Sequence, residues 1–152
     1  MQLTEHFTLK DLTFSETAQE CGLDNNPPPD AVERLRRLAE GLEEVQCLLG
    51  SALEISSAYR CSAVNQAVGG VSASHHVQGW AADFACPAYG PVLEVALAIC
   101  NSVIVFDTLI VEFGRWVHLS FAPTARRRLL TIYDDGASYV EGLWDEQGTR
   151  HA

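Results

Sequence analysis

The sequence is short of basic residues and has no long apolar run. It contains 10 Lys and Arg against 20 Asp and Glu among 152 residues, which gives a formal net charge of −10. Because phosphate neutralisation needs clustered Lys and Arg, this balance argues against a nucleic-acid or membrane partner. A solvated strand edge accounts for the only basic run, Arg126-Arg127-Arg128. No stretch approaches the ~18 apolar residues of a membrane span.

Cysteine usage excludes two further kinds of small protein. The five cysteines are odd in number and form no Cys-x-x-Cys pair, so neither a disulfide framework nor a cysteine zinc site is indicated. We expect Cys47, Cys86 and Cys100, which lie in apolar runs, to be small core residues. The start, Met1 to Glu5, lacks the basic and apolar regions of a secretory signal, so we expect a protein that is cytoplasmic as synthesised.

The chain is long enough, and at 47% hydrophobic residues apolar enough, for one domain with its own core. We expect a single domain over residues 1–152, with residues 1–29 as an arm packed on it. The clearest helix is Asp30–Leu49, in which apolar residues step by three and four. Its apolar stripe consists of Leu35, Leu38, Leu42, Val45 and Leu49.

The rest of the sequence predicts short strands and short helices. Strands are predicted at 53–57, 81–86, about 108–113, 116–121 and 129–133, and helices at 62–68 and after Gly90-Pro91. A loop is expected between Gly70 and His76. Helices that precede and interrupt an antiparallel sheet make an α+β arrangement.

Two imidazoles and one carboxylate suggest a metal site. His76 and Asp83 lie seven residues apart at the entry to a predicted strand, and His118 lies on a later strand. These are the ligand types of an open, three-ligand zinc site, which keeps one position for water. We therefore expect Zn²⁺ as the cofactor. Ser74, Ser120 and backbone carbonyls are candidates to orient the imidazoles.

A hydrolase of this kind also needs a base and a cation. Glu112 lies six residues before His118, and a hairpin turn at Gly114 would make the two face each other across adjacent strands. Its apolar neighbours would raise its pKa, which suits a general base. Arg60 is placed to bind an oxyanion or a substrate carboxylate. The structural alternatives are a paired carboxylate for Glu112 and a loop salt bridge for Arg60.

The same residues resemble those of a known family, the zinc D-alanyl-D-alanine carboxypeptidases and related peptidoglycan endopeptidases. The family signature is S-x-H-x-x-G-x-A-x-D, followed later by a W-x-H strand. Its fixed positions are filled here by Ser74, His76, Gly79, Ala81, Asp83, Trp116 and His118. The segment Ser57-Ala58-Tyr59-Arg60 is similar to the family's S-x-Y-R segment. The resemblance covers roughly residues 5–122 and is strongest to small, single-domain members often encoded by phages.

The resemblance implies a set of site residues. The implied metal ligands are His76, Asp83 and His118, the catalytic residues are Glu112 and Arg60, and the substrate-binding residues are Arg60, Ser74, Tyr59 and Trp116. There is one departure from the family pattern. Several relatives place the acidic base three residues before the last His, where this chain has Arg115, and Asp107 is the second candidate after Glu112.

The implied fold is a small antiparallel sheet that carries the zinc site between helices, as in these metallopeptidases and the related hedgehog-like domains. The implied activity is hydrolysis of peptide bonds in peptidoglycan stem peptides, as a carboxypeptidase or an endopeptidase. The expected partner is that peptide, with no nucleic acid and no membrane, and the expected state is a monomer. It would reach the cell wall after release or as part of a phage particle. The alternatives are a zinc-stabilised binding module, such as a phage virion or tail component, and a structural domain without metal.

Overall fold

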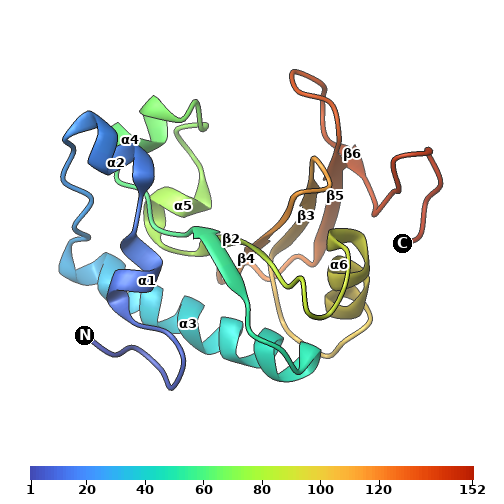
Figure 1. Cartoon of the computed structure of the whole chain (residues 1–152), viewed down its shortest axis with the longest axis horizontal. Helices are drawn as coiled ribbons and strands as arrows, with labels where there is room; N and C mark the ends of the chain where they lie inside the picture. The colour runs from blue at the N-terminus through green and yellow to red at the C-terminus, as the bar shows by residue number, and fades with distance from the viewer.

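A single mixed sheet of six strands runs through the protein (Figure 1). The computed structural model describes residues 1–152, and the strand order across the sheet is β1-β2-β4-β3-β5-β6. Every neighbouring pair is antiparallel except β3 and β5, which are parallel. The strands are β1 (Glu54–Ser57), β2 (Ala81–Ala85), β3 (Thr108–Glu112), β4 (Trp116–Ser120), β5 (Arg128–Ile132) and β6 (Val140–Glu141).

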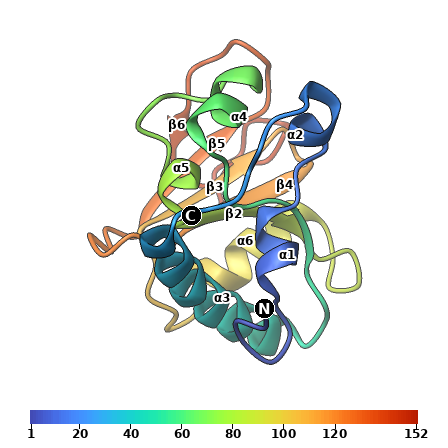
Figure 2. The ribbon, with the colours of Figure 1, turned by 90° about the vertical axis from the view of Figure 1, so that its left-hand side faces the viewer.

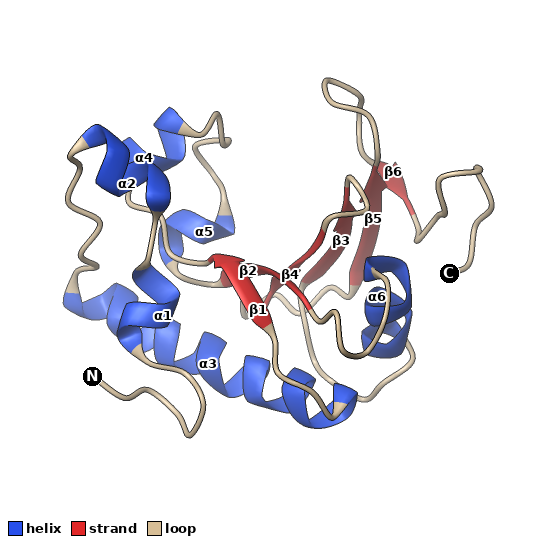
Figure 3. Cartoon of the chain, viewed as in Figure 1, coloured by secondary structure: helices blue, strands red, loops and turns tan.

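The helices form two groups around this sheet. They are α1 (Leu9–Thr13), α2 (Glu16–Cys21), α3 (Pro29–Leu49), α4 (Ser62–Ala67), α5 (His75–Gln78) and α6 (Val92–Cys100). α3 and α6 contact each other and lie together below the strands in Figure 2. The other helices gather beside β1 and β2, on the left in Figure 3. This arrangement confirms the α+β class, and none of the helices has the length and apolar composition needed to cross a membrane.

The long helix α3 anchors the core. It begins and ends within one residue of the predicted bounds, and Gly50 closes it in the left-handed conformation with φ 67°. Full burial of a Leu side chain contributes about 1.5–3 kcal/mol relative to exposure, so the buried stripe holds this helix firmly against the sheet. Its members with no exposed surface are Leu35, Leu38, Leu42 and Val45.

Alternation along the strands sorts side chains onto two faces. The face toward α3 and α6 receives apolar side chains, namely Ala82, Phe84, Val111, Val117 and Leu119. The intervening residues point to the opposite face. Asp83 and His118 are among them, so the open face of the sheet carries the groups predicted to bind metal.

Three elements differ from the sequence-based predictions. The segment before His76 is not all loop, because Ser74 Oγ accepts the His76 N–H and caps the one-turn helix α5. The sheet is not purely antiparallel, because residues 121–127 carry the chain past the start of β3 and let β5 run parallel to it. β5 is not the last strand, since β6 follows it with two residues, too few to show a periodic pattern.

Two predictions about surface and core residues are also wrong. Cys47 is exposed, since it lies on the outer side of α3, whereas Cys86 is 1% exposed. The basic run is not a solvated strand edge, because only Arg128 belongs to β5. Arg127 lies 4.4 Å from the centre of the Phe106 ring and donates hydrogen bonds to backbone carbonyls.

The third basic residue, Arg126, pairs with a buried carboxylate. Asp107 has no exposed surface and accepts hydrogen bonds from Arg126 Nε at 3.0 Å and from Thr108 Oγ1 at 2.7 Å. Thr124 and the Arg126 backbone N–H donate to the same carboxylate. These bonds, led by those from Arg126, hold the pKa of Asp107 well below its usual value. Asp107 is therefore a structural hub at the start of β3 rather than a base.

Replacement of Asp107 by Asn tests this hub. We expect the free energy of unfolding at pH 7 to fall by about 2–3 kcal/mol, because charge-assisted hydrogen bonds are lost. The lowered pKa stabilises the folded state fully above the unfolded pKa of about 3.9, and this contribution declines as pH falls from there towards the folded pKa. The deficit measured by urea unfolding should therefore shrink towards pH 3. Asp135→Asn, which removes an exposed carboxylate, is the matched control, and an equal loss in both variants would contradict the hub.

Candidate metal centre

Three side chains predicted to bind metal meet on the open face of the sheet. Asp83 on β2 lies directly opposite His118 on β4, and directly opposed residues point to the same face. His76 comes from α5. The ligand atoms of the three residues all lie within 4.8 Å of one another. Asp83 Oδ1 lies 3.0 Å from His118 Nδ1 and 3.2 Å from His76 Nε2.

A glycine sets the approach of α5 to this cluster. Gly79 ends the helix with φ 85°, a conformation that L side chains rarely adopt. A Cβ there would lie 3.3 Å from the carbonyl oxygen of Ala31 in α3. The chain therefore turns sharply between α5 and β2 while packed against α3, which brings His76 over the strand that carries Asp83.

The geometry and the chemistry of the three side chains fit a divalent metal. Tetrahedral ligands about 2.0–2.2 Å from zinc lie roughly 3.3–3.6 Å apart, close to the two separations at Asp83. His76 is 2% exposed and Asp83 is 8% exposed, and a buried charge needs a partner. Burial alone would raise the pKa of Asp83, but the charges and hydrogen bonds of His76 and His118 outweigh it and hold that pKa well below its usual value.

A backbone carbonyl orients one imidazole. His76 Nδ1 lies 2.7 Å from the carbonyl oxygen of Ala58, which follows β1. Because a carbonyl oxygen only accepts, Nδ1 carries a proton, and Nε2 is the nitrogen that faces Asp83. Such a bond to the outer nitrogen is the usual support of a metal-binding His. Of the candidates expected to orient the imidazoles, namely Ser74, Ser120 and backbone carbonyls, a carbonyl contacts the ring of His76.

The neighbouring histidine points elsewhere and ties α5 to β4. His75 Nδ1 lies 2.6 Å from Ser120 Oγ and 4.0 Å from Asp107 Oδ2. Ser120 has no exposed surface. His75 therefore does not join the three clustered ligands, and Ser120 supports the helix through His75 rather than through His76.

Glu112 lies on the same face, but its strand partner differs from the prediction. The turn contains three residues, with left-handed φ values at Phe113 and Gly114, so Glu112 pairs with Trp116 and not with His118. The predicted register is wrong by two positions, which leaves Glu112 and His118 on one face. Trp116 Nε1 donates to Glu112 Oε2 at 3.2 Å. Burial, and then the charge of Asp83, raise the pKa of Glu112, against the opposing effects of His118, Trp116 and Arg60.

Arg60 reaches the same carboxylates from the side of β1. Burial lowers the pKa of Arg60, while the charges of Asp83 and Glu112 act in the opposite direction. Its buried Nε has no hydrogen-bond partner. Arg60 also takes part in no salt bridge, so the structural alternative of a salt bridge that holds the loop is not found. A groove of about 420 Å³ lies beside it, lined mainly by residues 14–17 and 55–57. The guanidinium thus keeps a donor that no group of the chain uses.

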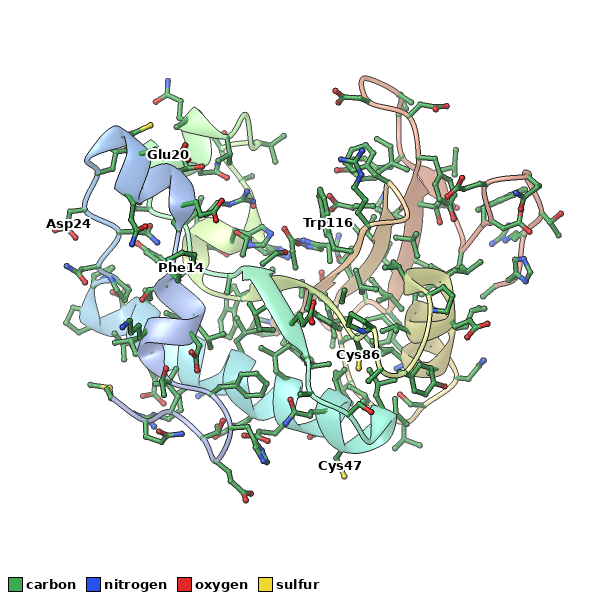
Figure 4. The ribbon with its side chains drawn as sticks, viewed as in Figure 1. Phe14, Glu20, Asp24, Cys47, Cys86 and Trp116 are labelled. Carbon is green, nitrogen blue, oxygen red and sulfur yellow. The ribbon has the colours of Figure 1, made fainter.

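The remaining residues predicted to bind substrate are Tyr59, Ser74 and Trp116. Tyr59 is 5% exposed and packs in the hydrophobic core, so it offers little surface to a substrate. The Ser74 hydroxyl is engaged in capping α5. Trp116 lies in the middle of the molecule on the β3 side in Figure 4. A groove of about 780 Å³ between α3 and residues 102–105 contains none of the clustered side chains.

A comparison with protein-family models agrees with the family resemblance seen in the sequence. The model of a family described as Peptidase M15 matches residues 5–120. That span includes the three clustered ligands, Glu112 and Arg60, and it ends before β5. No curated protein matches the chain.

Metal analysis of purified protein tests the cluster. We expect about one equivalent of zinc per chain, lost on His118→Ala, because a site with only two side-chain ligands binds metal weakly. His6→Ala should retain the metal, since His6 pairs with Glu43 on α3. A His118→Ala protein with undiminished zinc would show that the ion is held elsewhere.

Proposed function

The chain belongs to the Peptidase M15 family of metal-dependent peptidases, and on that premise we propose that it is a zinc peptidase that hydrolyses peptide bonds in peptidoglycan stem peptides. The observation that carries the proposal is the convergence of His76, Asp83 and His118 beside Glu112. Zinc is proposed because two imidazoles and one carboxylate are a common donor set for catalytic zinc. The proposed substrate class rests on the family.

The three clustered side chains would hold the metal. A divalent ion in such a site polarises a carbonyl and makes a water molecule acidic enough to react near neutral pH. The protein supplies the fixed geometry, since Asp83 and His118 are held by the pairing of β2 and β4 and His76 by the Ala58 carbonyl.

Glu112 is proposed to move the proton. Its raised pKa brings the carboxylate closer to the working pH, where a general base is most effective. The hydrogen bond from Trp116 fixes Oε2 and leaves Oε1 to accept a proton from the attacking water. The same oxygen then delivers that proton to the leaving amine of the cleaved peptide.

Arg60 is proposed to bind the oxygen that becomes negative when the peptide carbonyl is attacked. Arg60 takes part in no salt bridge and feels the charges of Asp83 and Glu112, and a preorganised cation beside developing negative charge lowers the barrier. We propose that the enzyme acts as a monomer, on the cell wall after release or as part of a phage particle, in keeping with its resemblance to small phage-type members of the family.

Replacement of Glu112 by Gln separates catalysis from binding. We expect the release of new amino groups from purified peptidoglycan to fall by about 10²- to 10⁴-fold, as for loss of a general base, with zinc retained. Glu33→Gln, on the solvated face of α3, should match the wild type. Release of amino groups by neither wild type nor variant would leave a zinc-containing binding module, and mass spectrometry of the digest would identify the bond that is cut.

Replacement of Arg60 by Lys tests the oxyanion donor. The charge is kept, but the planar fork of donors is lost, and we expect kcat/KM to fall by roughly 10²-fold. The zinc content should not change. Arg115→Lys, in the exposed turn between β3 and β4, is the matched control. Equal activity of Arg60→Lys and wild type would assign Arg60 to the fold instead.

A further inference from the structure

A tyrosine outside the matched span is brought to the open face of the sheet. β6 pairs with β5 so that Val140 lies opposite Thr131. Tyr139 immediately precedes β6, so continuing this register by one residue sets it beside Ile132, which is the β5 partner of Glu112 on β3. Since opposed residues share a face, Tyr139 lies on the face that carries Glu112. No pattern in the sequence indicates this placement.

Tyr139 lies within reach of the candidate site. Neighbouring strands are about 5 Å apart, so β6 lies about 10 Å from β3, a span that a tyrosine side chain leaning along the face can largely cover. Burial raises the pKa of Tyr139, and so do the charges of Glu112 and Asp83. The phenol therefore keeps its proton and can act as a donor. The residue is 50% exposed, so solvent and solutes can reach it.

Arg60 follows β1 and Tyr139 precedes β6, the two edge strands on opposite sides of the strands that carry Asp83 and Glu112. The charges of Asp83 and Glu112 act on both side chains. In Figure 1 the loop between β5 and β6 stands across from α4, with β2 and β4 between them. Figure 4 places Trp116 on the side of this loop and Phe14 on the other side. A peptide over the three clustered ligands would thus lie between a guanidinium and a phenol.

Glu112 and Asp83 already accept hydrogen bonds from other side chains, so the Tyr139 hydroxyl remains free to bond to a substrate. Glu112 Oε2 accepts from Trp116, and Asp83 Oδ1 is shared by the two imidazoles. Tyr133, at the other end of the same loop, donates to the carbonyl of Trp144, whereas the Tyr139 hydroxyl bonds to no atom of the chain. The loop is thus fixed at one end and presents an unpaired donor at the other.

We propose that Tyr139 positions the substrate, its hydroxyl donating a hydrogen bond to a carbonyl or carboxylate oxygen of the bound peptide. The loop of residues 133–139 forms the wall of the site opposite Arg60. The identity of the peptide rests on the proposed function, whereas the position of the donor rests on the register of β5 and β6.

Tyr139→Phe removes only the hydroxyl and is examined in two backgrounds. With Glu112 intact, kcat/KM for soluble stem peptides prepared from peptidoglycan should fall about 5- to 10-fold, as expected for one hydrogen bond. In Glu112→Gln protein, where turnover is suppressed, the dissociation constant of the same peptides by calorimetry should rise by a similar factor. Zinc content and Tm should not change. The matched control Tyr133→Phe should lower Tm without weakening peptide binding.

The two backgrounds distinguish failure of this inference from failure of the proposed function. Turnover by the wild type that Tyr139→Phe leaves unchanged overturns the inference and keeps the function. Peptide binding that depends on Tyr139 without any turnover supports the inference and overturns the function. A protein that neither binds nor cleaves the peptides overturns both. A loss of activity accompanied by a lower Tm or lost zinc would make Tyr139 a structural residue and also contradicts the inference.

Discussion

The pairing of β2 with β4 is the constraint on which the candidate site depends. It sets Asp83 directly opposite His118, and their neighbours Phe84 and Val117 are also opposed, on the other face. A slip of one residue would turn every side chain of one strand to the opposite face. That slip would bury a carboxylate or an imidazole against α3 and α6 and expose apolar surface. The hydrophobic core therefore fixes the ligand pair, although no ligand belongs to it.

Burial of Asp83 couples the site to the stability of the fold. The carboxylate is 8% exposed and ionised, and its nearest partners are two imidazoles. A buried charge without a compensating cation costs several kcal/mol. A metal ion bound there would supply that compensation, and its binding energy would then contribute to folding. The hydrogen bond from His76 to Ala58 extends the coupling to the end of β1.

Local patterns in the sequence are sufficient to predict the long helix, the main strands and the three clustered residues, because these features depend on spacing and alternation. The misassigned features depend on pairing between distant segments or on a single turn. The register of Glu112 follows from the left-handed conformation of Phe113, which no propensity favours. The parallel β3–β5 pair and the two-residue β6 form by pairing with distant segments, and local sequence patterns do not reveal such pairing. Cys47 lies on the outer side of a helix whose apolar stripe is only one face wide.

The segment after residue 120 covers the edge of β3 and anchors the loop of residues 133–139, whereas the clustered side chains and Glu112 all precede it. β5 pairs along the whole of β3, which would otherwise be an open edge strand beside the site. The segment is itself anchored, since Leu143 has no exposed surface and Thr131 bonds to Gly142 and Trp144. An anchored edge holds the loop of residues 133–139 at a fixed place relative to Glu112. Variation of that loop should leave the three clustered side chains undisturbed, because β2, β4 and α5 hold them on the other side of β3.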